Sequence, residues 1–413
     1  MTISLAYYTR IDNSNPVMRR PGTGVAGVAE GLTNARKQDR PCTGHIPSPL
    51  GRNRLSHESP IRKVLIYRLG SLGDTVVALP CFHLIARCFP HAERVLLTNL
   101  PVHAKAAASA SVLGDSGLVH GTMRYTVGTR RMGELLRLTL EIRRFGPDLL
   151  IYLMPMRPYG RVLRDRIFFR NAGVRRIVGL PGEWELKHRF DAATGLYEPE
   201  ARRLARAIAA LGDAHPEEMA NWDLRLSEAE RQDAVASLGA LGGRRLIACG
   251  PGTKMQSKDW GQEKWRELLA RLHAQYPLHG LALVGAQEDY EVSEYSAEWW
   301  RGAKVNLCGR LTPRETAAVL EGAEVFLGPD SGPMHLAASV GVPCVIAFSA
   351  HGLPGVWYPA GRQHQIVYHQ PECFGCGLET CVVMKKECMT SVTVEEMEQA
   401  VGRVLNPVLQ VLR

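Results

Sequence analysis

Short apolar runs alternate along the chain with longer segments in which apolar residues recur every three or four positions. VLIYRL (64–69), DLLIYL (148–153) and EVFLG (324–328) have the length of buried strands and lie next to glycine, proline or polar residues. MGELLRLTLEIRRF (132–145) and EKWRELLARLHAQ (263–275) have the period of amphipathic helices. Strands that alternate with helices predict parallel sheets, so the fold class is α/β.

The same pattern predicts two alternating halves on either side of the polar segment 213–244. The remaining strands are expected at 94–100, 175–180, 245–249, 281–285 and 343–348, and the remaining helices at 198–212, 312–323 and 394–412. Pro407 should kink the last of these helices, because proline removes a backbone donor and clashes with the preceding turn.

Residues 324–348 read as strand, short helix and strand, and they predict an anion site. Asp330 or Ser331 can cap the helix, and Pro333 lies near its first position. Gly332 has no side chain, so a ligand can approach the unpaired amides and the positive end of the helix dipole, which favour phosphate. His335 lies one turn after Ser331 and could face the same ligand. A plain capped helix with His335 in the core is the alternative.

Residues 64–90 read as a strand, a glycine turn and a helix that ends before Pro90. The turn contains Gly70, Gly73 and Asp74, and its spacing is not that of a dinucleotide-binding G-x-G-x-x-G. A carboxylate here lies at the carboxyl edge of the sheet, where open α/β folds bind ligands. By itself, such an aspartate is more often a helix cap than a base.

Together, RLGSLGDTVVALP and GPDSGPMHLAASVGVP resemble the two signatures of glycosyltransferase family 9, the heptosyltransferases of lipopolysaccharide assembly. The resemblance runs from about Ile61 to Leu412. It implies the GT-B architecture, with two Rossmann-like, doubly wound parallel-sheet domains facing a cleft. It also implies an inverting, metal-independent transfer with Asp74 as the base, ADP-heptose as the donor, and a lipopolysaccharide core or related glycan as the acceptor.

Composition and the resemblance together divide the chain into four parts. Residues 1–60 would be a disordered basic extension, and 61–225 an acceptor-binding domain. Residues 226–392 would form the nucleotide-sugar domain, and 393–413 a helix that packs back toward the first domain.

A third ligand-side segment, GPGTKMQSKDW (250–260), places glycines and hydroxyls after a strand. Lys258 matches the family pattern for a phosphate-binding lysine, with Lys254 as the alternative and a solvated loop as the plain reading. In GAQED (285–289), Glu288 is expected at the ribose, with Gln287 or Asp289 almost as plausible. The expected donor-binding set is Gly252, Thr253, Lys258, Glu288, Asp330, Ser331, Gly332, Pro333, Met334 and His335.

Acceptor contacts are expected from Gly73 and from three arginines, Arg157, Arg161 and Arg164. The arginines could meet phosphates or acidic sugars, or they could form a solvated basic loop. No Asp-x-Asp pair occurs in the chain, so metal-bridged diphosphate binding has no obvious ligand pair.

Four of the ten cysteines, Cys373, Cys376, Cys381 and Cys388, form a C-x2-C-x4-C-x6-C pattern. This spacing is compact enough for one structural zinc or iron ion, and unligated thiols are the alternative. Disulfides are less expected in a reducing cytoplasm.

Charge and hydropathy restrict the classes of partner that the chain is expected to bind. Residues 1–63 hold ten Lys/Arg against four Asp/Glu, so the rest of the chain is only mildly basic despite the net +9, and nucleic-acid binding gains little support. No apolar run approaches the ~20 residues that span a bilayer, and no signal peptide is recognisable. The expectation is a cytoplasmic protein with, at most, peripheral contact at the inner membrane. A GT-B-type nucleotide-sugar epimerase and a non-catalytic nucleotide-sugar-binding protein remain alternatives.

Overall fold

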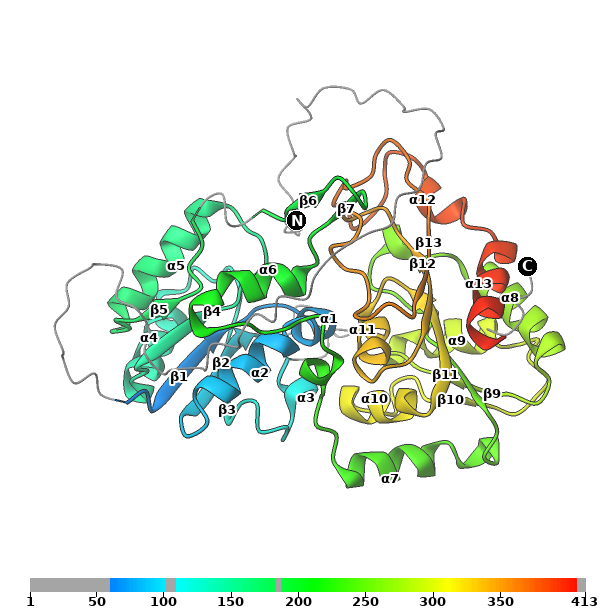
Figure 1. Cartoon of the computed structure of the whole chain (residues 1–413), viewed down its shortest axis with the longest axis horizontal. Coiled ribbons are helices and arrows are strands. Elements are labelled where there is room, and N and C mark those ends of the chain that lie inside the picture. Colours follow the sequence, from blue (N-terminus) through cyan, green and yellow to red (C-terminus); the bar gives the residue numbers. More distant parts are fainter. Residues whose placement is uncertain (1–59, 101–108, 183–186, 407–413) are drawn as a thin grey trace, which may run out of the picture.

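A computed structural model describes residues 60–100, 109–182 and 187–406 of the chain. It contains two α/β halves side by side, each built on a parallel sheet with helices on both faces (Figure 1). This confirms the expected α/β class and GT-B architecture. The expected N-terminal extension and the kink at Pro407 lie outside the described residues.

The first sheet has the strand order β3-β2-β1-β4-β5, with every pair parallel. Its strands are β1 (Lys63–Tyr67), β2 (Glu93–Asn99), β3 (Gly121–Tyr125), β4 (Leu149–Tyr152) and β5 (Ile177–Val178). Its helices are α1 (Leu72–Val76), α2 (Leu79–Cys88), α3 (Ser109–Leu113), α4 (Met132–Phe145), α5 (Tyr159–Asn171) and α6 (Glu200–Ala207). A small antiparallel hairpin of β6 (Phe190–Asp191) and β7 (Leu196–Tyr197) precedes α6.

The second sheet has the order β10-β9-β8-β11-β12-β13 and is also parallel throughout. Its strands are β8 (Leu246–Cys249), β9 (Gly280–Leu283), β10 (Lys304–Asn306), β11 (Ala323–Pro329), β12 (Cys344–Phe348) and β13 (Gln365–Tyr368). Its helices are α7 (Glu228–Ser237), α8 (Gln262–Gln275), α9 (Tyr290–Ser296), α10 (Pro313–Glu321), α11 (Gly332–Ser339), α12 (Glu387–Thr390) and α13 (Val394–Leu405).

Both sheets change winding direction once, and the candidate residues follow the strands at that change. In the first sheet the chain builds outward from β1 to β3 and then restarts at β4 on the other side of β1. In the second sheet it builds from β8 to β10 and restarts at β11 beside β8. Asp74 follows β1, Lys258 follows β8 and Ser331 follows β11. The carboxyl ends of strands at such a switch point are where open α/β sheets bind ligands.

The sequence pattern predicted no helix where the structure has α3, α5, α7, α9 and α12. α5 occupies the segment that contains Arg161 and Arg164, and α7 lies inside the polar segment 213–244 that was expected to join the two halves. α7 starts with a capping box, in which the Ser227 hydroxyl accepts from the amide of Glu230 while the Glu230 carboxylate accepts from the amide of Ser227. Only Ala234 of α7 is fully buried, so its apolar periodicity is weak.

α13 does not return toward the first half as expected, at least as far as its described residues go. Its buried side chains, which include Met397 and Val401, join the core beneath α8, β11 and β12 of the second sheet. The apolar face of α13 therefore already has a partner in its own half. Figure 1 shows α13 on the side of the molecule away from the first sheet.

The two halves meet through α1 and α11 and through a buried arginine of α10. The Arg314 guanidinium donates to the carbonyls of Leu113 (3.2 Å) and Leu224 (2.8 Å), and it also pairs with Glu230 of α7. One side chain thus ties the first half, the connecting segment and the second half together.

In the part of the chain that the structure describes, no helix is both long enough and apolar enough to span a bilayer.

Candidate functional site

The turn after β1 presents Asp74 at the start of α1. Gly70 has a φ of +138°, a conformation that other residues rarely adopt, and a Cβ there would lie 2.3 Å from the Cβ of Asp74. The Asp74 Oδ2 accepts from the amide (2.8 Å) and the hydroxyl (3.2 Å) of Ser71. The helix-cap reading of Asp74 is therefore correct for one carboxylate oxygen. The side chain remains 26% exposed, and a cap does not prevent the other oxygen from acting.

A buried charged network supports this turn, and the sequence analysis did not identify it. The Arg68 guanidinium donates to the carbonyl of Asp74 (2.6 Å) and lies 3.9 Å from its Oδ1. Behind Arg68, at 3.6 Å, is Glu200, which also pairs with Arg203 at 2.7 Å. The available signals were a charged residue, Arg68, directly after the buried strand β1, and the spacing of three residues between Glu200 and Arg203 on α6.

The start of α11 has the geometry of an anion site. Ser331 is the N-cap in extended conformation, and Pro333 occupies the second helical position. The Ser331 hydroxyl is buried and makes no hydrogen bond among the described residues. An unpartnered buried hydroxyl beside unpaired helical amides is an unmet donor, which a bound phosphate oxygen would accept.

Lys258 reaches this helix start. Its Nζ lies 2.7 Å from the Oδ2 of Asp330, the buried residue that precedes Ser331, and its side chain is 15% exposed. The solvated-loop reading of Lys258 is thus wrong, because Asp330 fixes the ammonium next to the helix N-terminus. Lys254, the alternative, is exposed.

Two histidines lie near this ion pair. The pKa of His335 is lowered to about 4, mainly by burial, with Asp330 opposing the shift and the neighbouring Lys258 adding to it. Burial followed by Lys258 also lowers the pKa of His351 to about 4. Both imidazoles are therefore neutral near pH 7. His351 was missed by the sequence analysis, although it follows β12 at the same sheet edge.

The remaining donor-side residues lie at the ends of β8 and β9. Gly252 packs so closely on Asp289 that a Cβ would lie 2.2 Å from the Asp289 carboxyl carbon. The Asp289 Oδ2 accepts from the amide of Ala286 (2.9 Å), and Glu288 points outward and is exposed. The Thr253 hydroxyl accepts from the amide of Met255 at 3.4 Å. On α11, Met334 is fully buried, whereas Ser331, Gly332 and Pro333 are partly exposed.

The contact between α1 and α11 brings the two sets of residues together. A Cβ on Gly73 would lie 2.8 Å from Cδ2 of His335, and one on Gly332 would lie 3.0 Å from the Leu72 side chain. Asp74 is also close enough to His335 for its charge to influence the His335 pKa. The carboxylate of the first half and the anion site of the second half therefore share one location.

The three arginines that were expected to contact the acceptor have different surroundings in the structure. The Arg157 guanidinium is buried and donates to Asp165 (2.7 Å) and to the Tyr152 hydroxyl (3.4 Å), so its role is internal. Arg161 is half-buried and Arg164 is 66% exposed, both on α5. The solvated-loop reading is wrong for Arg157, which is buried, and Arg161 and Arg164 lie on the helix α5 and not on a loop.

The four clustered cysteines are free thiols around α12. Burial and then the charges of Cys376, Cys388 and Cys381 raise the pKa of Cys373, which shows that the four are neighbours. Burial also raises the pKa of Cys381, but the amides of Lys386, Met384 and Val383 outweigh this effect and lower it. Among the described residues, no three or more His, Cys, Asp or Glu side chains are arranged to hold a metal ion.

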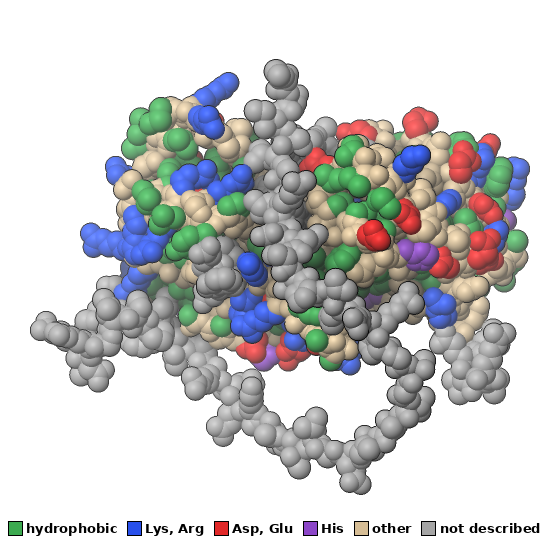
Figure 2. All heavy atoms as spheres, turned by 90° about the horizontal axis from the view of Figure 1, so that it is seen from above, with side chains coloured by type: hydrophobic (Ala, Val, Ile, Leu, Met, Phe, Trp, Pro, Cys, Tyr) green, Lys and Arg blue, Asp and Glu red, His purple; other side chains and the backbone are tan. Residues whose placement is uncertain are grey.

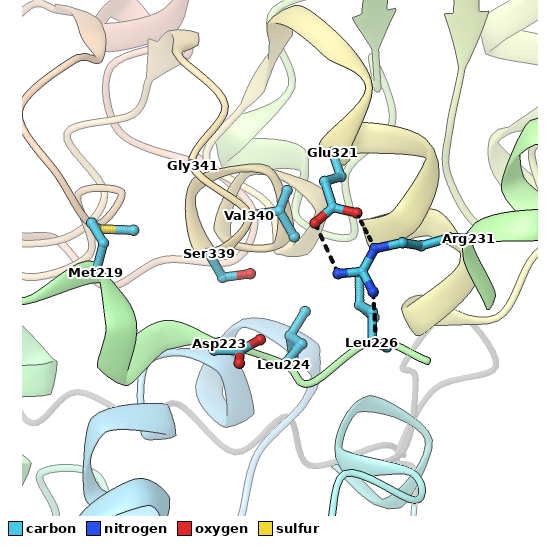
Figure 3. Close-up of a pocket in the computed structure, with 9 residues that line it drawn as sticks. All are labelled: Met219, Asp223, Leu224, Leu226, Arg231, Glu321, Ser339, Val340 and Gly341. Atoms are coloured by element: carbon cyan, nitrogen blue, oxygen red, sulfur yellow. Dashed lines mark hydrogen bonds and ion pairs between the residues drawn. The ribbon is translucent and has the colours of Figure 1, made fainter. Parts of the chain in front are cut away.

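A cavity of about 260 Å³ lies at the opposite end of α11, away from Ser331 (Figure 3). The Arg231–Glu321 ion pair, with contacts of 2.8 and 3.1 Å, forms one wall. The lining residues are Met219, Asp223, Leu224, Leu226, Arg231, Glu321, Ser339, Val340 and Gly341. None of the expected site residues is among them, so this cavity is separate from the candidate site.

Comparison with known sequences matches residues 183–386 to the model of glycosyltransferase family 9 (heptosyltransferase). The chain is 23% identical over 140 residues to the lipopolysaccharide core heptosyltransferase OpsX of Haemophilus influenzae. That alignment spans 33% of this chain and 39% of the relative, so the chain matches well under half of the relative's length.

Solved structures share the fold over most of the chain. A glycosyltransferase of family 9 from Veillonella parvula superposes with a TM-score of 0.63 at 17% identity, covering 83% of this chain and 97% of that one. The E. coli ADP-heptose lipopolysaccharide heptosyltransferase II superposes with a TM-score of 0.58, also at 17% identity, covering 85% of this chain and 100% of that one.

Proposed function

We propose that this chain, a member of glycosyltransferase family 9, transfers a sugar from a nucleoside diphosphate to a hydroxyl group of a glycan or glycolipid. The observation that carries the proposal is the contact of α1 with α11, which places the Asp74 carboxylate of one half beside the anion site of the other. Transfer needs a proton acceptor for the attacking hydroxyl and a binding site for the leaving diphosphate, and this location offers both.

The donor diphosphate would bind at the start of α11. The amides of Ser331, Gly332 and Met334 and the hydroxyl of Ser331 are the donors, and Lys258 supplies a positive charge that Asp330 holds in place. Pro333, at the second helical position, has no amide hydrogen and so supplies no donor. Gly252 and Thr253 would line the approach, and Glu288, exposed at the end of β9, would reach the ribose. ADP-heptose is the donor we propose, by similarity to the E. coli enzyme of that name.

The Asp74 carboxylate would act as the base. It takes the proton of the acceptor hydroxyl, whose oxygen forms a bond to the anomeric carbon as the bond from that carbon to the diphosphate oxygen breaks. The electron pair of the broken bond leaves with the nucleoside diphosphate, whose charge the α11 amides and Lys258 stabilise. A single displacement inverts the anomeric configuration, and this route uses no metal ion.

The acceptor would enter from the first half. Gly73 lies on α1 one residue before Asp74, and Arg161 and Arg164 project from the first turns of α5, beyond the carboxyl end of β4. Arg157 supports this region through Asp165 instead of contacting the acceptor. A lipopolysaccharide core or related glycan, whose phosphates and acidic sugars suit arginine, is the proposed acceptor class. We place the protein in the cytoplasm, at the inner face of the inner membrane, and its domain boundary near residue 226, where α7 begins to pack on α10.

The decisive experiment has two stages. Thermal unfolding is measured with ADP, UDP, GDP and CDP, and a ligand at 100 times its dissociation constant should stabilise the protein by about 2.7 kcal/mol. The stabilising nucleotide is then tested as its sugar conjugate with a purified core-glycan acceptor, and transfer is followed by mass spectrometry. Donor turnover to an epimer without an acceptor would support an epimerase instead. Binding without any reaction would support a non-catalytic binding protein, and no stabilisation by any nucleotide would contradict all three.

We also propose that Cys373, Cys376, Cys381 and Cys388 take up one structural zinc or iron ion. Four neighbouring thiols, one with a pKa lowered by backbone amides, have the chemistry of a donor set, although among the described residues no three or more of these side chains are arranged to hold a metal ion. Elemental analysis of protein purified without a metal-binding tag should find one ion per chain, and its removal should lower stability without abolishing nucleotide binding. Substoichiometric metal with four titratable thiols would rule the site out.

A further inference from the structure

The outer side of α4 carries a row of exposed apolar side chains. Met132, Leu136 and Leu140 stand four residues apart and are 76%, 59% and 54% exposed. Residues four apart lie on one side of a helix, so the three form a continuous strip. A shallow groove of about 510 Å³ runs along it, lined by Gly133, Leu136, Arg137, Leu140, Glu141 and Arg144.

α5 repeats the pattern beside α4. Tyr159, Leu163 and Ile167 are again four residues apart and are 42%, 45% and 54% exposed. Both helices bury their inner residues in the same core on one face of the first sheet, and the Arg143 guanidinium of α4 donates to the carbonyl of Asn171 at the end of α5 (2.7 Å). The two strips therefore lie on a common surface, here named the α4–α5 face.

A strongly basic segment of the chain carries this face. Residues 130–176 contain twelve arginines, no lysine and four acidic residues, so this segment alone has a net charge of +8, against +9 for the whole chain. Three of the four carboxylates are engaged locally: Asp165 by Arg157, Asp148 by the amides of Arg62 and Lys63, and Glu134 by the amide of Thr126. Figure 2 shows green apolar and blue basic side chains together over the first half, whereas red acidic ones gather on the second.

We propose that the α4–α5 face binds an anionic lipid surface. Helices that lie in a membrane interface combine a strip of large apolar side chains with flanking arginines, because the apolar groups enter the acyl boundary while the guanidinium groups pair with lipid phosphates. Arg137, Arg144, Arg166 and Arg170 flank the two strips and are exposed.

Two other occupants fit this face less well. A second copy of this chain docking face to face would bring two arginine-rich surfaces together, and their like charges oppose symmetric association. Single-stranded RNA would be recognised through stacking on aromatic rings, but five of the six strip residues are aliphatic and only Tyr159 is aromatic.

This inference deepens the proposed function and, for the lipid-linked nature of the acceptor, rests on it. α5 begins at Tyr159, shortly after the carboxyl end of β4, and β4 is the neighbour of β1, which leads to Asp74. A lipid surface against the α4–α5 face would therefore lie on the side of the first half from which Arg161 and Arg164 project.

The test is flotation of the full chain with vesicles of phosphatidylcholine, alone or mixed with an equal part of phosphatidylglycerol. The chain should bind only the mixed vesicles, and rising salt should release it. Leu136→Ser with Leu140→Ser should weaken binding at least about tenfold, and Arg137→Gln, Arg144→Gln and Arg166→Gln together should weaken it by about fivefold per arginine. Matched controls on the second half are Val235→Ser with Leu278→Ser, and Arg301→Gln, Arg310→Gln and Arg362→Gln together, all at exposed positions.

Equal loss in the control variants, or equal binding to neutral vesicles, would overturn the proposal. So would a dimer in analytical ultracentrifugation that the α4–α5 variants disrupt, or RNA binding that they abolish while vesicle binding is unchanged. Calorimetric titration with ADP separates this proposal from the proposed function. The α4–α5 variants should bind the nucleotide like the unmodified chain. If the unmodified chain binds vesicles but no nucleotide, the lipid-binding proposal is supported and the proposed function is contradicted.

Discussion

The two oxygens of the Asp74 carboxylate have different surroundings. One oxygen is held by Ser71, and the other lies toward Arg68 and the start of α11. Capping and base catalysis are compatible in one side chain, because the cap fixes the orientation that the free oxygen needs.

Asp74→Asn should lower transfer by about 10²–10⁴-fold with donor binding retained, since the amide keeps the shape but accepts no proton. Transfer rates and ADP titrations measure the two effects separately. Asp233→Asn, at an exposed position on α7, is the control. Turnover of the Asp74 variant near that of the unmodified chain would remove Asp74 from the mechanism.

Lys258→Ala should weaken nucleoside diphosphate binding by about 1.5–3 kcal/mol, the usual range for a hydrogen bond to a charged group. It also leaves the buried Asp330 carboxylate without its cation, so the melting temperature should fall as well. Calorimetry on Lys258→Ala and on the exposed Lys254→Ala compares the two candidates. A larger loss of affinity at Lys254 would reverse their assignment.

Acid should destabilise the protein through its buried histidines. The folded-state pKa of His335 is lowered to about 4, below the ordinary 6.5, so between these values the unfolded chain binds a proton that the folded chain does not. The stability contributed by neutral His335 is therefore complete above pH 6.5 and decreases as the pH falls toward 4. His335→Gln should flatten the pH dependence of urea unfolding in this window, and an unchanged slope would contradict the burial argument.

Among the elements, α1 and α11 matter most, because their packing unites the two halves of the site. Each presents a glycine to the other, and the close approach depends on the missing side chains. The short α1 has few buried residues of its own, so its position depends on this partner.

Gly73→Ala and Gly133→Ala form a matched pair within helices. Alanine favours a helix over glycine by roughly 0.5–1 kcal/mol, and at Gly133 nothing lies within 4 Å of the new Cβ. Gly133→Ala should therefore raise the unfolding free energy by that amount. Gly73→Ala should not raise the unfolding free energy and should impair transfer, because its Cβ would lie 2.8 Å from the buried His335 ring. Equal behaviour of the two variants in melting and transfer assays would mean that α1 and α11 do not need this contact.

For the molecule as a whole, Arg314 is the side chain that joins the halves. It satisfies carbonyls of the first half and of the connecting segment, and with Ser227 it holds the pKa of Glu230 at about 2 against the opposing effect of burial.

Arg314→Gln should lower the unfolding free energy by about 2–3 kcal/mol, because a shorter neutral group leaves Glu230 and several buried carbonyls unsatisfied. Proteolysis of the connecting segment near Arg225 should also become faster. Arg310→Gln, at an exposed position on the same half, is the control for chemical denaturation. Stability equal to that of the control would show that other contacts hold the halves together.

The sequence determined the alternation of strands and helices and the two ligand turns, because both depend on local chemistry. Burial of both sheet faces requires the apolar runs now seen as β1, β4 and β11, and the helical period of 132–145 corresponds to α4 over the same residues. Ser331, Pro333 and Gly332 start a helix through caps and backbone preferences that need no distant partner. α5 and α7 were missed because their apolar faces are narrow and interrupted by arginine or acidic residues.

Only the tertiary structure decided which charges act together. Lys258 and Asp330 are 72 positions apart in the sequence, and nothing local predicts that one neutralises the other beside a helix start. The same holds for Arg68 with Glu200, for Arg314 with two distant carbonyls, and for Arg157, which looked like a ligand-binding group and is an internal support. Charge pairing depends on distance in space and on burial, and both come from how the two sheets are wound and packed.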